Sequence, residues 1–154
     1  MYTKQEAAQL RKECWTTYGQ YMKPVPTEGG EKVNWINYKS GYKHIRFTMQ
    51  ADQYKAIIAI EISHPDTDMQ RLYTEQFLQM KKLFHTVMKE EWAWDFFTTD
   101  AYGNTIGRIY KEMIDISIFD KNNWPQLITF FKYRIIRLHE FWSSARYTFE
   151  TLGQ

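Results

Sequence analysis

Three charged residues of one predicted β-hairpin are the first candidates for chemistry in this sequence: Arg46, Asp52 and Glu61. Carboxylates can bind a metal ion or act as a general acid or base, and a guanidinium can bind an anion. A buried Glu61 needs a cation, and Arg46 on the adjacent strand is the predicted partner. Two interpretations stay open. Either Arg46 and Glu61 form a structural ion pair, or Glu61 is a catalytic or ligand-binding carboxylate with Asp52 and Arg46 nearby.

The last predicted helix carries a second candidate surface, in which basic and aromatic side chains are interleaved. Its residues are Phe130, Lys132, Tyr133, Arg134, Arg137, Phe141 and Arg146. Basic side chains neutralise phosphates and aromatic rings stack on bases, so the pattern fits a nucleic-acid or partner surface. It fits the solvated flank of an ordinary helix equally well, and the sequence leaves both interpretations open.

No metal or cofactor site is predicted. The four histidines include no i, i+4 pair, and Cys14 is the only cysteine. His64 with Asp66 and Asp68 comes closest to a ligand cluster, but helix capping already accounts for both aspartates. The sequence also lacks a glycine-rich phosphate loop and a GxSxG nucleophile elbow. These features favour a protein that is not an enzyme.

The single cysteine also bears on the compartment, because no intramolecular disulfide can form. Cys14 has apolar helical neighbours, which is typical of a buried thiol in a reducing environment. The first residues are charged and contain no apolar run, so no signal peptide is predicted. No stretch has the roughly 18 apolar residues that a membrane span requires. We therefore expect a soluble cytoplasmic protein.

The segment from Lys43 to Ser63 predicts the hairpin that positions the first candidates. In its first strand, apolar residues alternate with polar ones, as in a strand with one buried face. The apolar set is Ile45, Phe47, Met49 and Ala51. A turn at 51–53 follows. Residues 55–63 are apolar on nearly both faces, which predicts a central strand covered on both sides.

Three helices surround this hairpin in the sequence. Thr3 and Glu6 have capping-box spacing and predict a helix over about 4–22, which Pro24 and Pro26 end. Thr67 and Gln70 repeat that spacing before a helix over about 68–90. Asn122 or Asn123 can cap a last helix that runs to about residue 150. Its apolar residues occupy more than one face, so it is either sandwiched inside the fold or offers a surface to a partner.

Three further strands complete the prediction, over residues 32–38, 92–98 and 105–119, the last of them bent or bulged. The resulting order is helix, three-strand meander, helix, two strands, helix. Helices with long apolar seams packed on a largely antiparallel or mixed sheet form an α+β domain. The 154 residues fit a single domain, 1–154, with enough core to fold without a metal or disulfide.

Composition narrows the function. The formal net charge is only +2, so a general polyanion-binding character is not supported. Aromatic residues make up 18% of the chain, more than a small core usually absorbs. Some rings should therefore lie on a surface or interface, where they give contact area at little entropic cost.

The predicted element order resembles the core of the PD-(D/E)xK nuclease-like superfamily. That resemblance implies an acidic residue near the end of the second strand and an Asp/Glu-x-Lys motif on the third. Asp52 and Glu61 occupy roughly these places, but Ser63 stands where the lysine belongs. Without this lysine, activation of a metal-bound water is compromised, so the resemblance implies a degenerate relative rather than an active nuclease.

Nearly the whole chain also resembles the bacterial domain of unknown function 4268. The resemblance is carried by Asn34-Trp35, Lys39-Ser40-Gly41, Gln76-Phe77, Lys81-Lys82, Trp92-x-Trp94 and the stretch from Asp120 to Trp124. It implies a small intracellular bacterial protein, with longer relatives in which the domain accompanies nuclease-like or restriction-associated regions. It implies no catalytic residues.

Two functions are predicted, and a third stays open. The first is a non-enzymatic binding or assembly module, expected to be a homodimer because of its aromatic excess and the broad apolar surface of its last helix. The alternative is a degenerate nuclease-like protein with a nucleic-acid-related role. The third is a small-molecule pocket between the sheet and a helix, lined by Trp and Tyr.

Overall fold

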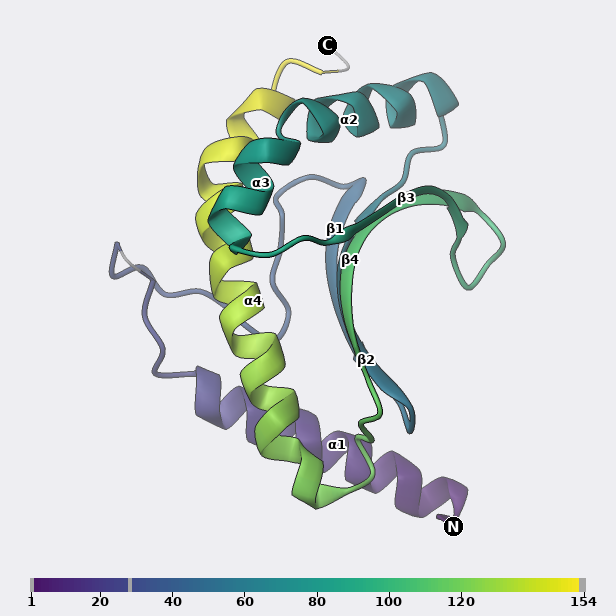
Figure 1. Ribbon diagram of the computed structural model, residues 1–154, viewed down its shortest axis with the longest axis vertical. Helices are drawn as coiled ribbons and strands as arrows, with labels where there is room; N and C mark the ends of the chain where they lie inside the picture. The colour runs from purple at the N-terminus through teal and green to yellow at the C-terminus, as the bar shows by residue number, and fades with distance from the viewer. Residues whose placement is uncertain (1, 28, 153–154) are drawn as a thin grey trace.

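The computed structural model describes residues 2–27 and 29–152 and confirms the α+β class. Figure 1 shows its elements along the chain. In order they are α1 (Lys4–Met22), β1 (Ile45–Ala51), β2 (Lys55–Ile62), α2 (Thr67–Gln79), α3 (Lys81–Met88), β3 (Ala93–Thr99), β4 (Thr105–Ile114), the 3-10 turn η1 (Lys121–Asn123), α4 (Trp124–Ala145) and the 3-10 turn η2 (Arg146–Phe149). Within the described ranges, no helix is long and apolar enough to cross a membrane.

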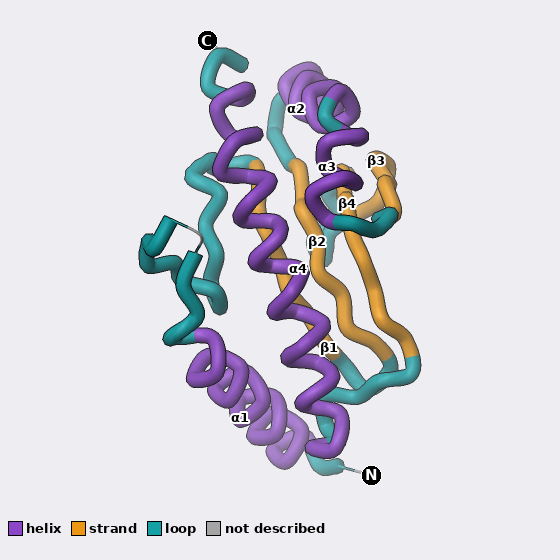
Figure 2. The backbone as a smooth tube through the Cα atoms, turned by 60° about the vertical axis from the view of Figure 1, so that its left-hand side comes forward, coloured by secondary structure: helices purple, strands orange, loops and turns teal. Residues whose placement is uncertain are grey.

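The four strands form one antiparallel sheet in the order β1-β2-β4-β3. Figures 1 and 2 show α4 running along one face of this sheet, with α1 near one end of α4 and α2 near the other. Among the described residues, no helix lies on the opposite face of the sheet (Figure 1). The prediction that β2 is central is correct, but helices pack on one face of the sheet only, so the predicted cover on both sides of β2 is wrong.

The core lies between the sheet and α4. The inward face of β2 is fully buried and consists of Ala56, Ile58, Ile60 and Ile62. α4 also contacts α1 and α3, and it buries Leu127, Phe130, Phe131, Ile135, Leu138, Phe141, Trp142 and Ala145. Its apolar residues on several faces are therefore used inside this chain, and the sandwiched interpretation of the helix is the correct one.

The predicted strand over residues 32–38 does not form. The Asn34 side-chain oxygen accepts hydrogen bonds from the backbone N–H groups of Ile36 (3.1 Å) and Asn37 (3.0 Å). This turn bends the chain where the alternating pattern predicted an extended segment. The expected three-strand meander is therefore a two-strand hairpin, and the element order that suggested a nuclease-like core is not present.

Several helix ends also differ from the prediction. The expected helix over 68–90 is divided at Met80, whose φ of −100° and ψ of 11° separate α2 from α3. Asp66, not Thr67, caps α2 by accepting from the N–H groups of Asp68 and Met69. Asn123 precedes α4 without a side-chain cap bond, because its oxygen accepts from the N–H of Ser117 at 2.8 Å.

Candidate functional site

Asp52 and Glu61 lie at opposite ends of β2 and do not form one site. Asp52 lies in the β1–β2 turn, where Oδ1 accepts from the N–H groups of Tyr54 (2.7 Å) and Lys55 (2.9 Å). Lys55 is the first residue of β2 and Glu61 is the last but one. At roughly 3.3 Å per residue, these two positions are about 20 Å apart. No group of three His, Cys, Asp or Glu side chains in the described part of the chain could hold a metal ion.

Glu61 is paired with Arg108 of β4 rather than with Arg46. The Arg108 Nη2 lies 3.1 Å and Nε 3.3 Å from Glu61 Oε2, and the side chains are 25% and 15% exposed. Arg46 lies opposite Glu61 in the register but is exposed. An interior strand has two neighbours, and the sequence alone does not show which one supplies the partner.

The same register places Asp95 of β3 opposite Arg108. Arg46, Glu61, Arg108 and Asp95 therefore cross the uncovered face of the sheet with alternating charge, and we call them the charge row. Adjacent opposite charges on neighbouring strands stabilise each other modestly. The row is balanced, and it does not present a concentrated charge to a ligand.

Most residues of the candidate surface on α4 are buried or paired with other residues of the chain. Phe130 and Phe141 are buried, which contradicts their predicted place on a surface. Arg134 forms hydrogen bonds with both carboxylate oxygens of Glu90, each at 2.9 Å, and so fastens the chain after α3 to α4. Only Tyr133 of the named aromatic residues is exposed.

The remaining basic residues of that surface are also engaged. Arg137 donates to the backbone oxygen of Met88 at 3.3 Å, and Lys132 lies 3.1 Å from the hydroxyl of Tyr21. Arg146 lies over the rings of Tyr42 and Tyr147. The set does not form the continuous basic and aromatic surface that its spacing suggested.

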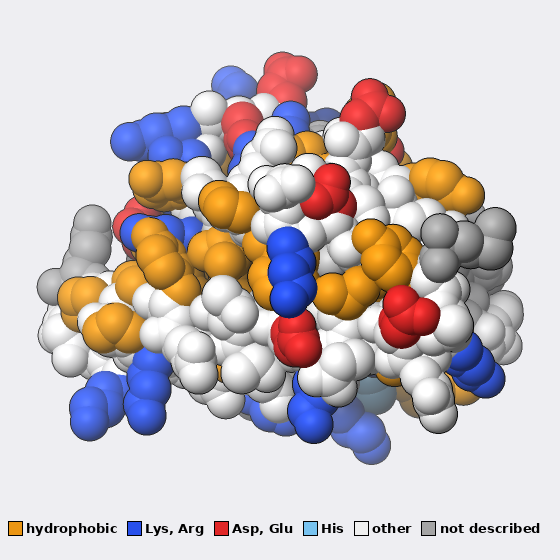
Figure 3. Space-filling model, turned by 90° about the horizontal axis from the view of Figure 1, so that it is seen from below, with side chains coloured by type: hydrophobic (Ala, Val, Ile, Leu, Met, Phe, Trp, Pro, Cys, Tyr) orange, Lys and Arg blue, Asp and Glu red, His pale blue; other side chains and the backbone are white. Residues whose placement is uncertain are grey.

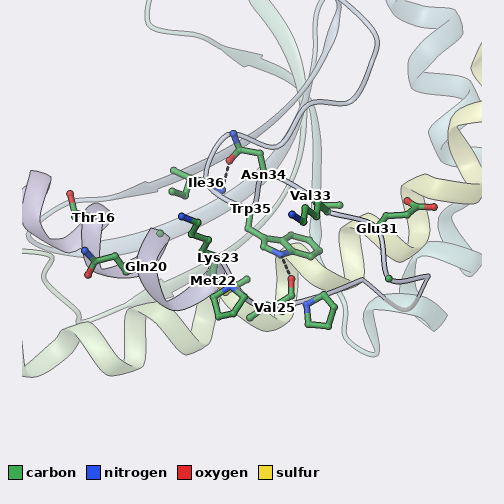
Figure 4. A pocket seen from close by; sticks show the side chains of 15 residues that line it. Thr16, Gln20, Met22, Lys23, Val25, Glu31, Val33, Asn34, Trp35 and Ile36 are labelled. Carbon is green, nitrogen blue, oxygen red and sulfur yellow. Dashed lines mark hydrogen bonds between the residues drawn. The ribbon is translucent and has the colours of Figure 1, made fainter.

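A cavity of about 810 Å³ opens between the end of α1 and the segment that follows it, and we call it the α1 pocket (Figure 4). Its volume lies within the range of small-molecule sites, roughly 300 to 1,000 Å³. The apolar lining residues are Met22, Pro24, Val25, Pro26, Val33, Trp35 and Ile36. The predicted pocket was placed between the sheet and a helix and lined by Trp and Tyr. This pocket lies instead between a helix and a loop, and only Trp35 fits that description.

Hydrogen bonds hold the loop wall of the α1 pocket in place. The Trp35 indole N–H donates to the backbone oxygen of Val25 at 2.9 Å, which joins the two ends of the loop. The Tyr18 hydroxyl of α1 donates to the backbone oxygen of Trp35 at 3.4 Å. Thr27 accepts from the N–H of Glu31 at 2.9 Å. These bonds give a defined wall to a segment without helix or strand.

α1 and the loop meet closely at Gly19. A Cβ at this position would lie 2.3 Å from Ile36 Cδ1, so a glycine permits the present approach of Ile36 to the helix. Viewed from below, hydrophobic side chains gather on the side of the molecule that carries this loop, with Lys and Arg at the margins (Figure 3). The sequence held one signal for the pocket, namely two prolines and two glycines directly after a helix.

The polar residues of the α1 pocket are arranged unevenly. They are Thr16, Gln20, Lys23, Glu31, Lys32 and Asn34. Figure 4 shows the Lys23 side chain extending from the end of α1 toward Ile36, whereas Glu31 points away. Glu31 instead acts electrostatically on Tyr38 and His139, where it opposes the lowering of the His139 pKa that burial causes. The arrangement can bind a molecule, but it offers no paired acid and base.

Comparison with known proteins identifies the family of the chain. Neither a curated protein nor a solved structure matches the chain. The family model described as "Domain of unknown function (DUF4268)" matches residues 10–146, a range that includes β1 to β4, α4 and the whole lining of the α1 pocket. The chain therefore belongs to the DUF4268 family.

Proposed function

We propose that this protein is a non-enzymatic binding module that holds a small organic molecule in the α1 pocket. The observation that supports the proposal is the cavity itself, about 810 Å³ with a mainly apolar lining and a few polar groups at its edge. Concave apolar sites of this size with sparse polar groups are typical of small-molecule binding. Hydrogen bonds within the loop and one from Tyr18 of α1 hold the loop wall, so little ordering is required when a ligand binds.

The residues of the pocket favour binding over catalysis. Its lining contains no His, Cys or Asp among the described residues, and its one carboxylate, Glu31, points away from the cavity. General acid–base catalysis needs a titratable group within hydrogen-bond reach of the substrate. Lys23 and Thr16 alone do not form a nucleophile with an activating base.

The test is a search for ligands combined with a variant that fills the cavity. Neutral and acidic aromatic molecules are titrated against the labelled full chain, and backbone amide shifts are followed by NMR. We expect shifts concentrated at α1 and residues 24–36. Gln20→Trp places an indole in the pocket from an exposed helix position and should abolish them.

The matched control is Gln5→Trp, on the same helix but away from the pocket. This variant should leave the shifts and the affinity unchanged. The proposal is wrong if no molecule perturbs α1 and residues 24–36, or if both tryptophan variants bind ligands equally well.

Assembly as a homodimer, in the cytoplasm, is the second part of the proposal. Its support is now the exposure of Leu72 and Leu78 on α2 and of Leu83 on α3, since the apolar residues of α4 are used inside the chain. Light scattering at low micromolar concentration tests it. A Leu72→Asp, Leu83→Asp variant should become monomeric if these helices form the interface, and a monomeric parent protein would contradict the homodimer.

A nucleic-acid-related role is the alternative proposal. Its remaining support is the pair Lys132 and Tyr133, because Phe130 and Phe141 are buried and Arg134 is paired with Glu90. Binding of a short single-stranded oligonucleotide should weaken steeply as salt rises and should fall in Lys132→Gln. Binding that does not depend on salt, or no binding at low salt, would contradict this alternative.

A further inference from the structure

We propose that the ligand of the α1 pocket is an organic acid, with an apolar body against Val33 and Ile36 and a carboxylate bound by the ammonium group of Lys23. This inference rests on the proposed binding function and specifies its ligand class.

The loop wall offers apolar surface rather than hydrogen bonds. The indole N–H of Trp35 is already bound to the backbone oxygen of Val25, and the side-chain oxygen of Asn34 is already bound to two backbone N–H groups. The ring of Trp35 is itself only 2% exposed, so the surface left for a ligand is chiefly the side chains of Val33 and Ile36. An apolar body, aromatic or aliphatic, matches this wall because it leaves no polar group unpaired.

The charge at the pocket is positive. Lys23 and Lys32 line it, against the single carboxylate of Glu31. Glu31 points away and acts on Tyr38 and His139 instead. The Lys23 ammonium forms no ion pair or hydrogen bond with any residue from 2–27 or 29–152. A flexible cation beside an apolar cavity recognises an anionic group attached to an apolar body.

The position of Lys23 has a competing explanation. Lys23 is the C-terminal cap residue of α1, where a cation is favoured by the partial negative charge of the helix end. That role accounts for a lysine, but not for the direction of its side chain toward Ile36 across the cavity (Figure 4). The two roles differ in what they affect. A cation that serves only the helix end changes stability, whereas a cation that binds the ligand changes affinity for acids alone.

The experiment compares two probes of nearly equal shape, 4-phenylbutyrate and 4-phenylbutan-1-ol, each titrated by NMR against the full chain. We expect the acid to bind at least about tenfold more tightly than the alcohol, as a charge-assisted hydrogen bond allows. Lys23→Met keeps the aliphatic stem, so it should remove this preference and leave the affinity for the alcohol unchanged. Lys4→Met, at the other end of α1, is the control and should change neither affinity.

The other outcomes overturn either the organic-acid inference or the binding function itself. Equal affinity for acid and alcohol in the parent protein overturns the organic-acid inference and leaves the binding function standing. An equal loss of both affinities in Lys23→Met also overturns the inference, because Lys23 would then act through the shape of the pocket. If neither probe, nor any molecule of the wider search, perturbs α1 and residues 24–36, the binding function itself is wrong.

Discussion

The guanidinium of Arg108 lies 3.1 Å from the carboxylate of Glu61, and Arg46 lies on the opposite side of the same glutamate in the register of the sheet. The two arginines are therefore neighbours of one acid, but only Arg108 forms a hydrogen-bonded ion pair with it. This relationship makes Glu61 part of the sheet architecture rather than of a metal site.

Removal of Arg108 should destabilise the fold more than removal of Arg46. Arg108→Ala leaves a mostly buried carboxylate without its partner, which costs about 1–3 kcal/mol in the free energy of unfolding. Arg46→Ala changes an exposed side chain and should cost less than about 0.5 kcal/mol. Urea unfolding of both variants measures the difference. Equal losses would show that the two arginines share Glu61.

Gly41 should be more sensitive to substitution than Gly103, although both have a positive φ (86° and 81°). A Cβ at Gly41 would lie 2.8 Å from Arg146 Nη2, whereas a Cβ at Gly103 meets nothing within 4 Å. Gly103→Ala should therefore lower the free energy of unfolding only by the backbone penalty of about 1 kcal/mol. Gly41→Ala should lower it further, because the new Cβ displaces Arg146. Thermal unfolding compares them. A larger effect at Gly103 would contradict the argument.

The effect of Gly19→Ala on stability should depend on the side chain of Ile36. Alanine in the last turn of α1 gains up to about 0.5–1 kcal/mol from helix propensity, but its Cβ displaces Ile36 from its present position. In an Ile36→Ala background, Gly19→Ala should raise the free energy of unfolding by the whole of this amount. In the parent protein it should raise the free energy of unfolding by less. A double-mutant cycle by urea unfolding measures the coupling. Zero coupling would mean that Ile36 does not pack against Gly19.

Stability should fall in weak acid because of two histidines. Burial is the main cause that lowers the pKa values of His44 and His139 below their ordinary value of 6.5, and for His44 the charges of His64 and Lys43 act in the same direction. Between the lowered pKa and 6.5 the unfolded chain binds more protons than the folded one, so the free energy of unfolding decreases as pH falls through this window. Above the window this contribution is fully present.

Urea midpoints at pH values above and below this window check the prediction. The Tyr38 hydroxyl lies 2.7 Å from His139 Nδ1, a hydrogen bond whose donor depends on the tautomer of the imidazole. His139→Gln keeps an acceptor but cannot titrate, so its loss of stability in acid should be smaller than that of the parent protein. An unchanged acid dependence in both His139→Gln and His44→Gln would contradict the assignment.

Local patterns in the sequence predicted the elements whose structure depends on their own residues. The alternation around Ile45 and the apolar run around Ile58 predicted the β1–β2 hairpin. A row of apolar residues that includes Ile135 and Leu138 predicted α4. These predictions are correct because burial of one face imposes a fixed period on strand and helix.

Other features depend on contacts between distant segments and could not be predicted in the same way. Arg108 as the partner of Glu61 follows from the strand order β1-β2-β4-β3, which no local pattern contains. Phe141 is buried against Phe84 of α3, and Phe130 is buried against Phe131 and the guanidinium of Arg134. The predicted strand at 32–38 failed for a local reason, since the side chain of Asn34 bonds to the backbone ahead of it.

One wall of the α1 pocket belongs to neither the sheet nor a helix. Trp35 of this segment packs against His139 of α4, but no described residue of 24–36 takes part in strand pairing, so substitutions at its exposed positions would leave the sheet unchanged. Under the proposed binding function, members of the DUF4268 family can differ in this segment, and so in their ligands, while they share the same sheet and α4.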